Sequence, residues 1–155
     1  MTAVGQVRGG PDFVQFLELL VEYERSLPVA LRHGRTPDLA LVRKEYCEPN
    51  AAFIALVNDA ASGCVAVTRQ DDATAIVKRL YVRPAFRNCG VARALVAAVI
   101  EYCREGDCER VVLDTERESL PAAHRLYASL GFRECEPYGT VQYNNPTFME
   151  LRLSR

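Results

Sequence analysis

Apolar residues near the start of the chain recur at helical spacing and predict a first helix. The stripe consists of Phe13, Phe16, Leu17 and Leu20. Asp12, followed three positions later by Gln15, resembles a capping box, in which a short polar side chain accepts a hydrogen bond from the first turn. We therefore expect a helix from about residue 12 to residue 26.

A second helix is expected after the turn-rich stretch LPVALRHGR. Thr36 can cap it, and Pro37 suits the first helical position, where no backbone hydrogen bond is lost. Its apolar face is formed by Leu39, Val42 and Tyr46. Pro49 follows and ends the helix, because proline cannot continue the helical hydrogen-bond ladder.

From Ala52 the apolar residues form runs that are typical of β-strands. The runs AFIALV, CVAVT and ATAIVKRLYV are separated by breaks at NDAASG and RQDD. They predict three antiparallel strands. Pro84 ends the third strand, because proline has no amide hydrogen to donate to a sheet.

The second half of the chain alternates between helical and strand patterns. Gly90 opens a helix that ends near Gly106, and its apolar face carries Val91, Leu95, Ala98, Val99 and Tyr102. RVVLDT predicts a buried strand, SLPAAHRLYASLGF predicts a helix stopped by Gly131, and TFMELRL predicts a final strand. This order predicts an α/β (α+β) fold, with a mixed, mostly antiparallel central sheet flanked by about four helices.

Size and charge narrow the class of protein. A chain of 155 residues with 49% hydrophobic content fits one compact domain over residues 1–155. Lys plus Arg (19) nearly balance Asp plus Glu (20), so no basic field attracts a phosphate backbone, and nucleic acid is not expected as a partner. No apolar run reaches the length of a membrane span, and MTAVGQVRGG lacks the features of a signal peptide. We expect a cytoplasmic protein without membrane association.

Six cysteines in a chain of this length require a test for a disulfide framework or a zinc site. They are Cys47, Cys64, Cys89, Cys103, Cys108 and Cys135. No pair is separated by the two residues of a CxxC unit, and His33 and His124 both lie far from any paired-cysteine unit. We therefore expect no metal, and we interpret the cysteines as small buried side chains or free thiols.

The segment KRLYVRPAFRNCGVARALVAAVI predicts an anion site where a strand ends and a helix begins. The first turn of a helix leaves amide hydrogens without partners, and its dipole favours negative charge there. Gly90 and Ala92 leave room for phosphates to approach these amides, while Arg87 and Arg93 add positive charge. The segment matches neither the Walker motif nor the three-glycine dinucleotide fingerprint.

The same segment resembles the GNAT superfamily of acyl-CoA N-acyltransferases, whose signature is Arg or Gln, two residues, Gly, one residue, then Gly or Ala. In this chain the signature reads Arg87, Asn88, Cys89, Gly90, Val91, Ala92. The preceding KRLYVRP and the later LYASLGF resemble that family's strand and second helix at the expected separation. The resemblance covers residues 52–153. The part before Pro49 is similar to the family's usual pair of N-terminal helices, which shapes the acceptor site.

What this resemblance implies is acetyl transfer from acetyl-CoA to the primary amine of a small-molecule or protein acceptor, by direct attack in a ternary complex. The backbone amides of residues 88–92 would hold the pyrophosphate. The backbone of Leu80, Tyr81 and Val82 would pair with the pantetheine arm, in a space where the signature strand and the RVVLDT strand splay apart. Tyr127, in LYASLGF, matches the tyrosine that protonates the departing thiolate.

One departure from the family concerns the general base. Many relatives carry a glutamate on the strand before KRLYV, but here that stretch reads ATAIVK and has no carboxylate. The candidates elsewhere are Glu45, Asp114, Glu116 and His124, and the sequence does not choose among them. A non-catalytic acyl-CoA-binding regulatory module therefore stays open as the alternative function.

Three further points stay open at this stage. Tyr127 also falls on an apolar stripe, so a purely structural role in the core is its alternative. The loop residues Tyr138, Tyr143 and Asn144 are candidates to close over the acceptor. The acceptor itself is not identified, and a homodimer through a sheet edge or the C-terminal strand is an ordinary arrangement for this fold.

Overall fold

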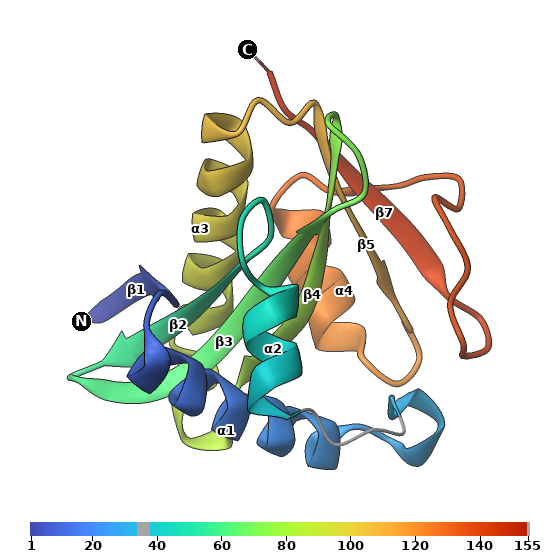
Figure 1. The fold of residues 1–155 in the computed structure, drawn as a ribbon. Helices are drawn as coiled ribbons and strands as arrows, with labels where there is room; N and C mark the ends of the chain where they lie inside the picture. Colours follow the sequence, from blue (N-terminus) through green and yellow to red (C-terminus); the bar gives the residue numbers. More distant parts are fainter. Residues whose placement is uncertain (34–37, 155) are drawn as a thin grey trace.

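The computed structural model describes residues 1–33 and 38–154 (Figure 1). Seven strands form one sheet in the order β1-β2-β3-β4-β5-β7-β6. They are β1 (Thr2–Gln6), β2 (Ala51–Val57), β3 (Ala60–Arg69), β4 (Thr74–Val82), β5 (Arg110–Thr115), β6 (Arg133–Glu134) and β7 (Thr147–Arg152). The helices are α1 (Gly10–Ser26), α2 (Leu39–Glu45), α3 (Val91–Glu105) and α4 (Pro121–Ser129), with short 3-10 turns at Val29–Leu31 and Pro84–Phe86. Within the described residues only β4 and β5 pair in parallel, so the predicted mixed, mostly antiparallel sheet is confirmed.

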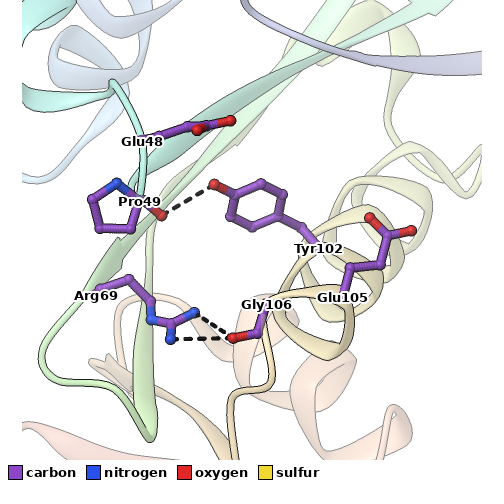
Figure 2. Close-up of a pocket in the computed structure, with 6 residues that line it drawn as sticks. All are labelled: Glu48, Pro49, Arg69, Tyr102, Glu105 and Gly106. Carbon is purple, nitrogen blue, oxygen red and sulfur yellow. Dashed lines mark hydrogen bonds between the residues drawn. The ribbon is translucent and has the colours of Figure 1, made fainter.

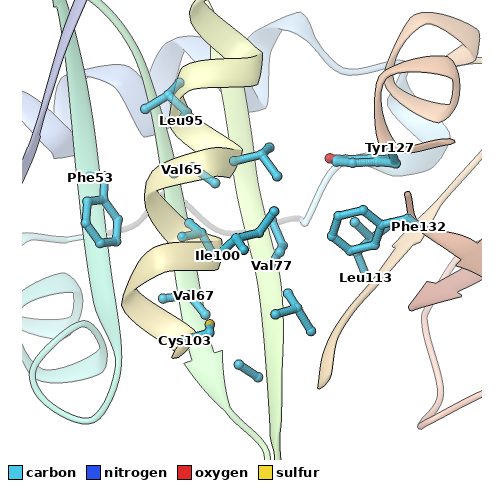
Figure 3. Close-up of a cluster of buried hydrophobic side chains, with 14 of the residues drawn as sticks. Phe53, Val65, Val67, Val77, Leu95, Ile100, Cys103, Leu113, Tyr127 and Phe132 are labelled. Atoms are coloured by element: carbon cyan, nitrogen blue, oxygen red, sulfur yellow. The ribbon is translucent and has the colours of Figure 1, made fainter. Parts of the chain in front are cut away.

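Both faces of the sheet are covered by helices. On one face, α3 and the residues around α4 pack on a cluster that includes Val65, Val77, Leu95, Leu113 and Phe132 (Figure 3). On the other face, α1 and α2 pack on a second cluster that includes Phe16, Leu19, Val42, Ile54 and Ala66. The central strands are therefore buried on both sides, which explains why they read as nearly continuous apolar runs.

The hairpin between β2 and β3 is tighter than the sequence predicted. The expected break at NDAASG is wrong, because residues 60–63 already belong to β3. Asn58 and Asp59 alone make the turn, with φ angles of 50° and 67°. Two left-handed residues match the twist of the flanking strands, and asparagine and aspartate adopt that conformation more readily than most side chains.

The helix starts also differ from the expected ones. The first helix begins at Gly10, and Asp12 accepts a hydrogen bond from the Arg8 backbone amide (3.1 Å), so the predicted capping role of Asp12 is wrong. Thr36 and Pro37, predicted at the start of the second helix, lie outside the described residues. That helix is capped by Asp38, which accepts from the Leu41 amide at 2.9 Å.

The edge strands β1 and β6 were not predicted. The first strand pairs with β2 from Thr2 to Gln6, but it alternates between exposed and half-buried positions and contains Gly5. The other strand is two residues long. Neither has the apolar alternation that identifies a strand from sequence, because pairing along one edge holds a strand without burying either of its faces deeply.

Gly63 permits the close approach of β3 and β4, and its substitution is expected to destabilise the fold. A Cβ atom at this position would lie 2.5 Å from the carbonyl oxygen of Tyr81. We expect Gly63→Ala to lower the free energy of unfolding by about 2–3 kcal/mol and the melting temperature by roughly 5–10 °C. Circular dichroism during thermal unfolding measures this. Gly5→Ala is the matched control, since its Cβ meets nothing within 4 Å. An unchanged melting temperature in Gly63→Ala would contradict the close approach.

Candidate active site

The sheet opens between its two central parallel strands. Pairing of β4 with β5 is confined to residues 74–76 and 110–112. Beyond that point β4 continues to Val82 and pairs only with β3, while β5 continues to Thr115 and pairs with β7. The predicted splay between these strands is therefore confirmed, and it leaves one edge of β4 without a neighbouring strand.

A bulge shapes the free edge of β4. The register with β3 shifts between Cys64 and Ala66, and Arg79 takes a left-handed conformation with φ 61°. After the bulge, the Arg83 amide donates to Ser62 on the β3 side at 2.8 Å. Because successive residues of a strand alternate between its two edges, the carbonyl of Val82 faces the opening. There it accepts a hydrogen bond from Nε of Arg87 at 3.0 Å.

The loop that leads into α3 presents a row of free backbone amides. Asn88 and Gly90 are both left-handed, with φ angles of 62° and 80°. The first helical hydrogen bond runs from the Ala94 amide to the Gly90 carbonyl (3.0 Å), and among the described residues the amides of residues 88–93 form no hydrogen bond of ordinary geometry. Alternating backbone conformations turn such amides into a concave, anion-binding surface.

Space is left open in front of these amides. A Cβ built on Gly90 meets no heavy atom within 4 Å. Arg87 and Arg93 are exposed on either side, and Nη2 of Arg93 donates to Ser129 Oγ of α4 at 2.7 Å. The Cys89 side chain is exposed beside the loop, with its sulfur 3.4 Å from the Arg87 carbonyl oxygen. The site fits a pyrophosphate by its geometry and by its charge.

Tyr127 projects from α4 toward the interior of the molecule (Figure 3). Its ring is only 6% exposed and lies edge-on to Phe132 at a centroid distance of 5.7 Å. Burial raises the pKa of the Tyr127 phenol well above its usual value, and the nearby Tyr23 and Asp114 raise it further. The phenol therefore keeps its proton at neutral pH, as a proton donor must.

The four candidate bases have different surroundings. Both carboxylate oxygens of Glu116 accept backbone amides of the following turn, at 2.9 and 2.8 Å. Glu45 is exposed on α2, and His124 has a buried Nδ1 without a partner among the described residues. Burial, and then the charge of Arg117, lowers the pKa of His124. Asp114 differs from all three, because it lies on β5 beyond the point where the strands part.

Two tyrosines from the loop before β7 hold Asp114. Its two carboxylate oxygens accept hydrogen bonds from the hydroxyls of Tyr138 (2.7 Å) and Tyr143 (2.6 Å). Burial, together with the Asp114 charge, raises the pKa values of both phenols. The loop singled out from sequence thus reaches the opening through Tyr138 and Tyr143, whereas Asn144 is exposed.

Sequence reasoning did not single out Arg79 or Tyr23 as site residues. Arg79 occupies the bulge of β4, and Tyr23 lies on α1 with its ring 6.1 Å from that of Tyr81. Burial raises the pKa of Tyr23 to about 12, with smaller effects from Arg79 and Asp114. The one sequence feature that pointed to Arg79 was its place in KRLYV. A basic residue inside a strand that helices cover on both faces has to reach a polar site.

A separate hollow lies at the other end of α3 (Figure 2). Pro49, Arg69, Tyr102 and Gly106 are among the residues that line it. The Tyr102 hydroxyl donates to the Pro49 carbonyl at 3.1 Å, and Arg69 donates twice to the Gly106 carbonyl at 3.3 Å. Since α3 has 15 residues, this hollow is roughly 22 Å from the free amides. Arg69 and Tyr102 thus hydrogen-bond to backbone carbonyls of the hollow itself, and we assign the hollow no part in the site.

All six cysteines lie in the described part of the chain and are free thiols, with Cys64, Cys103 and Cys108 buried. In residues 1–33 and 38–154, no group of three His, Cys, Asp or Glu side chains is placed to hold a metal ion. No helix within these ranges combines the length and the apolar character needed to cross a bilayer.

A sheet that opens between two parallel strands beside a helix N-terminus is the architecture of acyl-CoA-dependent acyltransferases, and comparison with known proteins agrees. The profile of the acetyltransferase (GNAT) family matches residues 15–132. An uncharacterized N-acetyltransferase of Schizosaccharomyces pombe is 32% identical, over 99% of this chain and 96% of that protein. The N-acetylaspartate synthetase of Danio rerio is 37% identical over 76% of this chain, which spans 42% of that longer protein.

Solved structures show the same fold. A putative acetyltransferase from Salmonella typhimurium, determined with its cofactor acetyl-CoA, superposes with a TM-score of 0.79 at 22% identity, covering 99% of this chain and 94% of that one. The chain belongs to the acetyltransferase (GNAT) family. The fold and enzyme class implied by the sequence are therefore confirmed.

Proposed function

We propose that this protein transfers the acetyl group of acetyl-CoA to a primary amine by direct attack in a ternary complex. One observation supports this proposal above the others. The free edge of β4 leads directly to the unpartnered amides of residues 88–93. The amides would bind the pyrophosphate together with Arg87 and Arg93. The backbone of Leu80, Tyr81 and Val82 would hold the pantetheine arm along the free edge.

In the proposed reaction, the step assigned to a side chain of this protein is protonation of the departing thiolate by Tyr127. A neutral amine attacks the thioester carbon, its nitrogen loses a proton, and the carbon–sulfur bond breaks. Tyr127 donates its proton to the departing thiolate and then recovers one from solvent, so the products are the N-acetyl amine and CoA as a thiol. The raised pKa of the Tyr127 phenol keeps its proton in place at neutral pH, so the hydroxyl is available as the donor when the thiolate departs.

The test of acetyl transfer is thiol release across a panel of amines. Wild-type protein is mixed with acetyl-CoA and, separately, with free amino acids, spermidine, an aminoglycoside and a lysine-containing peptide, and free CoA is measured with a thiol reagent. We expect release that depends on the amine, together with the mass of an acetylated product. Tight acetyl-CoA binding with no release for any amine would instead favour the non-catalytic acyl-CoA-binding module.

Direct attack predicts that no acetyl group is stored on the enzyme. Cys89 is the exposed thiol next to the free amides, and we propose that only its backbone takes part. We expect Cys89→Ser to change kcat and KM for acetyl-CoA by less than about twofold, because serine keeps the backbone and nearly the same size. Intact mass measured after incubation with acetyl-CoA alone is expected to show no added acetyl group. An acetylated cysteine that turns over on addition of amine would contradict direct attack.

A further inference from the structure

We propose that the acceptor is a free α-amino acid, whose carboxylate is bound by Arg79 and whose amino group lies against Asp114. This inference rests on the proposed acetyl transfer and goes further by naming the class of acceptor. It is carried by the positions of the two charged residues on opposite sides of the opening in the sheet. Arg79 lies three residues beyond the last paired position of β4, and Asp114 lies two residues beyond that of β5.

Arg79 presents a partly buried cation on the face covered by α1 and α2. Its guanidinium lies beside Tyr46, Tyr23 and Glu45: burial lowers the pKa of Arg79, but these neighbours outweigh it and raise the pKa overall. No carboxylate forms an ion pair with it within the described ranges. Glu45 is exposed and forms no ion pair with this partly buried guanidinium, and a bidentate carboxylate is the ligand that best matches the geometry of such a cation.

Two other carboxylates near this face, Glu22 and Glu24, are already paired. Arg83 donates to Glu22 at 2.7 Å, and Glu24 pairs with His33 at 2.8 Å. The Tyr46 hydroxyl is also buried and lies close to both Arg79 and Glu45, and its contacts with them fall outside ordinary hydrogen-bond geometry. A buried hydroxyl beside a guanidinium that has no ion pair provides a second group that can bind a carboxylate oxygen.

Asp114 presents the opposite charge across the opening. Two phenols fix its carboxylate from the side of the loop before β7, as described above. The Tyr23 hydroxyl lies within the electrostatic reach of both groups, because Arg79 lowers its pKa and Asp114 raises it. Asp114 also acts on Tyr127, the residue to which we assign the proton transfer. An ammonium group held at Asp114 would lie in the opening beside β5, where the proposed transfer takes place.

The two charges favour a zwitterion over the other amines. A polyamine or an aminoglycoside carries several positive charges and no carboxylate, so Arg79 would repel it. A protein N-terminus has an amide where an amino acid has its carboxylate, and a lysine side chain has only methylene groups there, so either would leave the guanidinium unpaired. A free α-amino acid satisfies Arg79 and Asp114 together.

The test compares amino acids with their own amides. L-aspartate, L-leucine and L-lysine, each paired with its α-amide, are assayed for thiol release and titrated calorimetrically into the protein saturated with free CoA. We expect at least one amino acid to be preferred over its α-amide by roughly tenfold or more in kcat/KM and in affinity. The amide has the less basic amine and would be the better substrate if the carboxylate were ignored.

Arg79→Met is expected to remove this preference by raising KM for the amino acid roughly ten- to a hundredfold, with KM for acetyl-CoA unchanged. Arg79→Lys should restore part of it, because a charge remains. Lys78→Met is the matched control, since it removes an exposed cation one position away. Amides used as well as amino acids by wild type, or an unchanged preference in Arg79→Met, would overturn the inference and leave acetyl transfer intact. Amino acid binding without any thiol release would overturn the proposed function alone.

Discussion

Replacement of Tyr127 by phenylalanine is expected to lower kcat by roughly 100- to 1000-fold while KM for acetyl-CoA stays within about twofold. The substitution removes the one hydroxyl that we assign to protonation of the thiolate, and it leaves the ring that packs on Phe132. Because CoA would then leave without a proton donor, the loss falls on the chemical step rather than on binding. Steady-state thiol release at saturating acetyl-CoA and amine measures it.

Two results separate this role from a structural one. Tyr102→Phe is the control, since it removes a phenol from the far end of α3, where the hydroxyl bonds only the Pro49 carbonyl. It should leave kcat unchanged. If Tyr127→Phe kept the kcat of wild type, Tyr127 would be a core residue only, as its apolar stripe alone indicates, and the proton would have to come from another group.

Gly90→Glu is expected to abolish acetyl-CoA binding. Gly90 has a φ angle of 80°, and its missing side chain points into open space in front of the free amides. A glutamate would fill that space and place a negative charge where the pyrophosphate is proposed to lie. Free CoA should raise the melting temperature of wild type and leave that of the variant unchanged.

The control for Gly90→Glu accounts for backbone strain. Gly131→Glu is that control, because it introduces the same charge at another left-handed glycine, with φ 98°, at the end of α4. A non-glycine residue at a left-handed position costs about 1–2 kcal/mol, so we expect both variants to be somewhat less stable than wild type. Gly131→Glu should still be stabilised by CoA. Stabilisation of Gly90→Glu to the same extent as wild type would show that the phosphates lie elsewhere.

Most of the fold could be predicted from the sequence because its elements carry strong local patterns. The strands β4, β5 and β7 and the helix α3 begin and end within about one residue of the expected positions. Each has a clear apolar pattern, and β4, β7 and α3 also have a glycine or proline at or near a boundary. The signature around Gly90 is likewise local, since one loop and one helix turn supply the whole row of amides.

The parts that were not predicted depend on contacts between distant residues. Edge pairing alone defines β1, and no residue in it signals this. The charged groups at the opening come from β4 and β5, and their proximity follows from the point at which two strands stop pairing. Asp114 was one of four candidates with equal support in the sequence. Only the fold places it across the opening from Arg79 and within hydrogen-bond distance of Tyr138 and Tyr143.

The measurement that tests the central claim most directly is calorimetric titration of acetyl-CoA into the wild-type protein. The account predicts one site per chain with micromolar-range affinity, and similar affinity for free CoA, because most of the proposed contacts involve the pyrophosphate and the pantetheine arm. Absence of binding heat at several temperatures, with no CoA-dependent rise in melting temperature, would contradict the account and leave the acetyltransferase fold without its co-substrate.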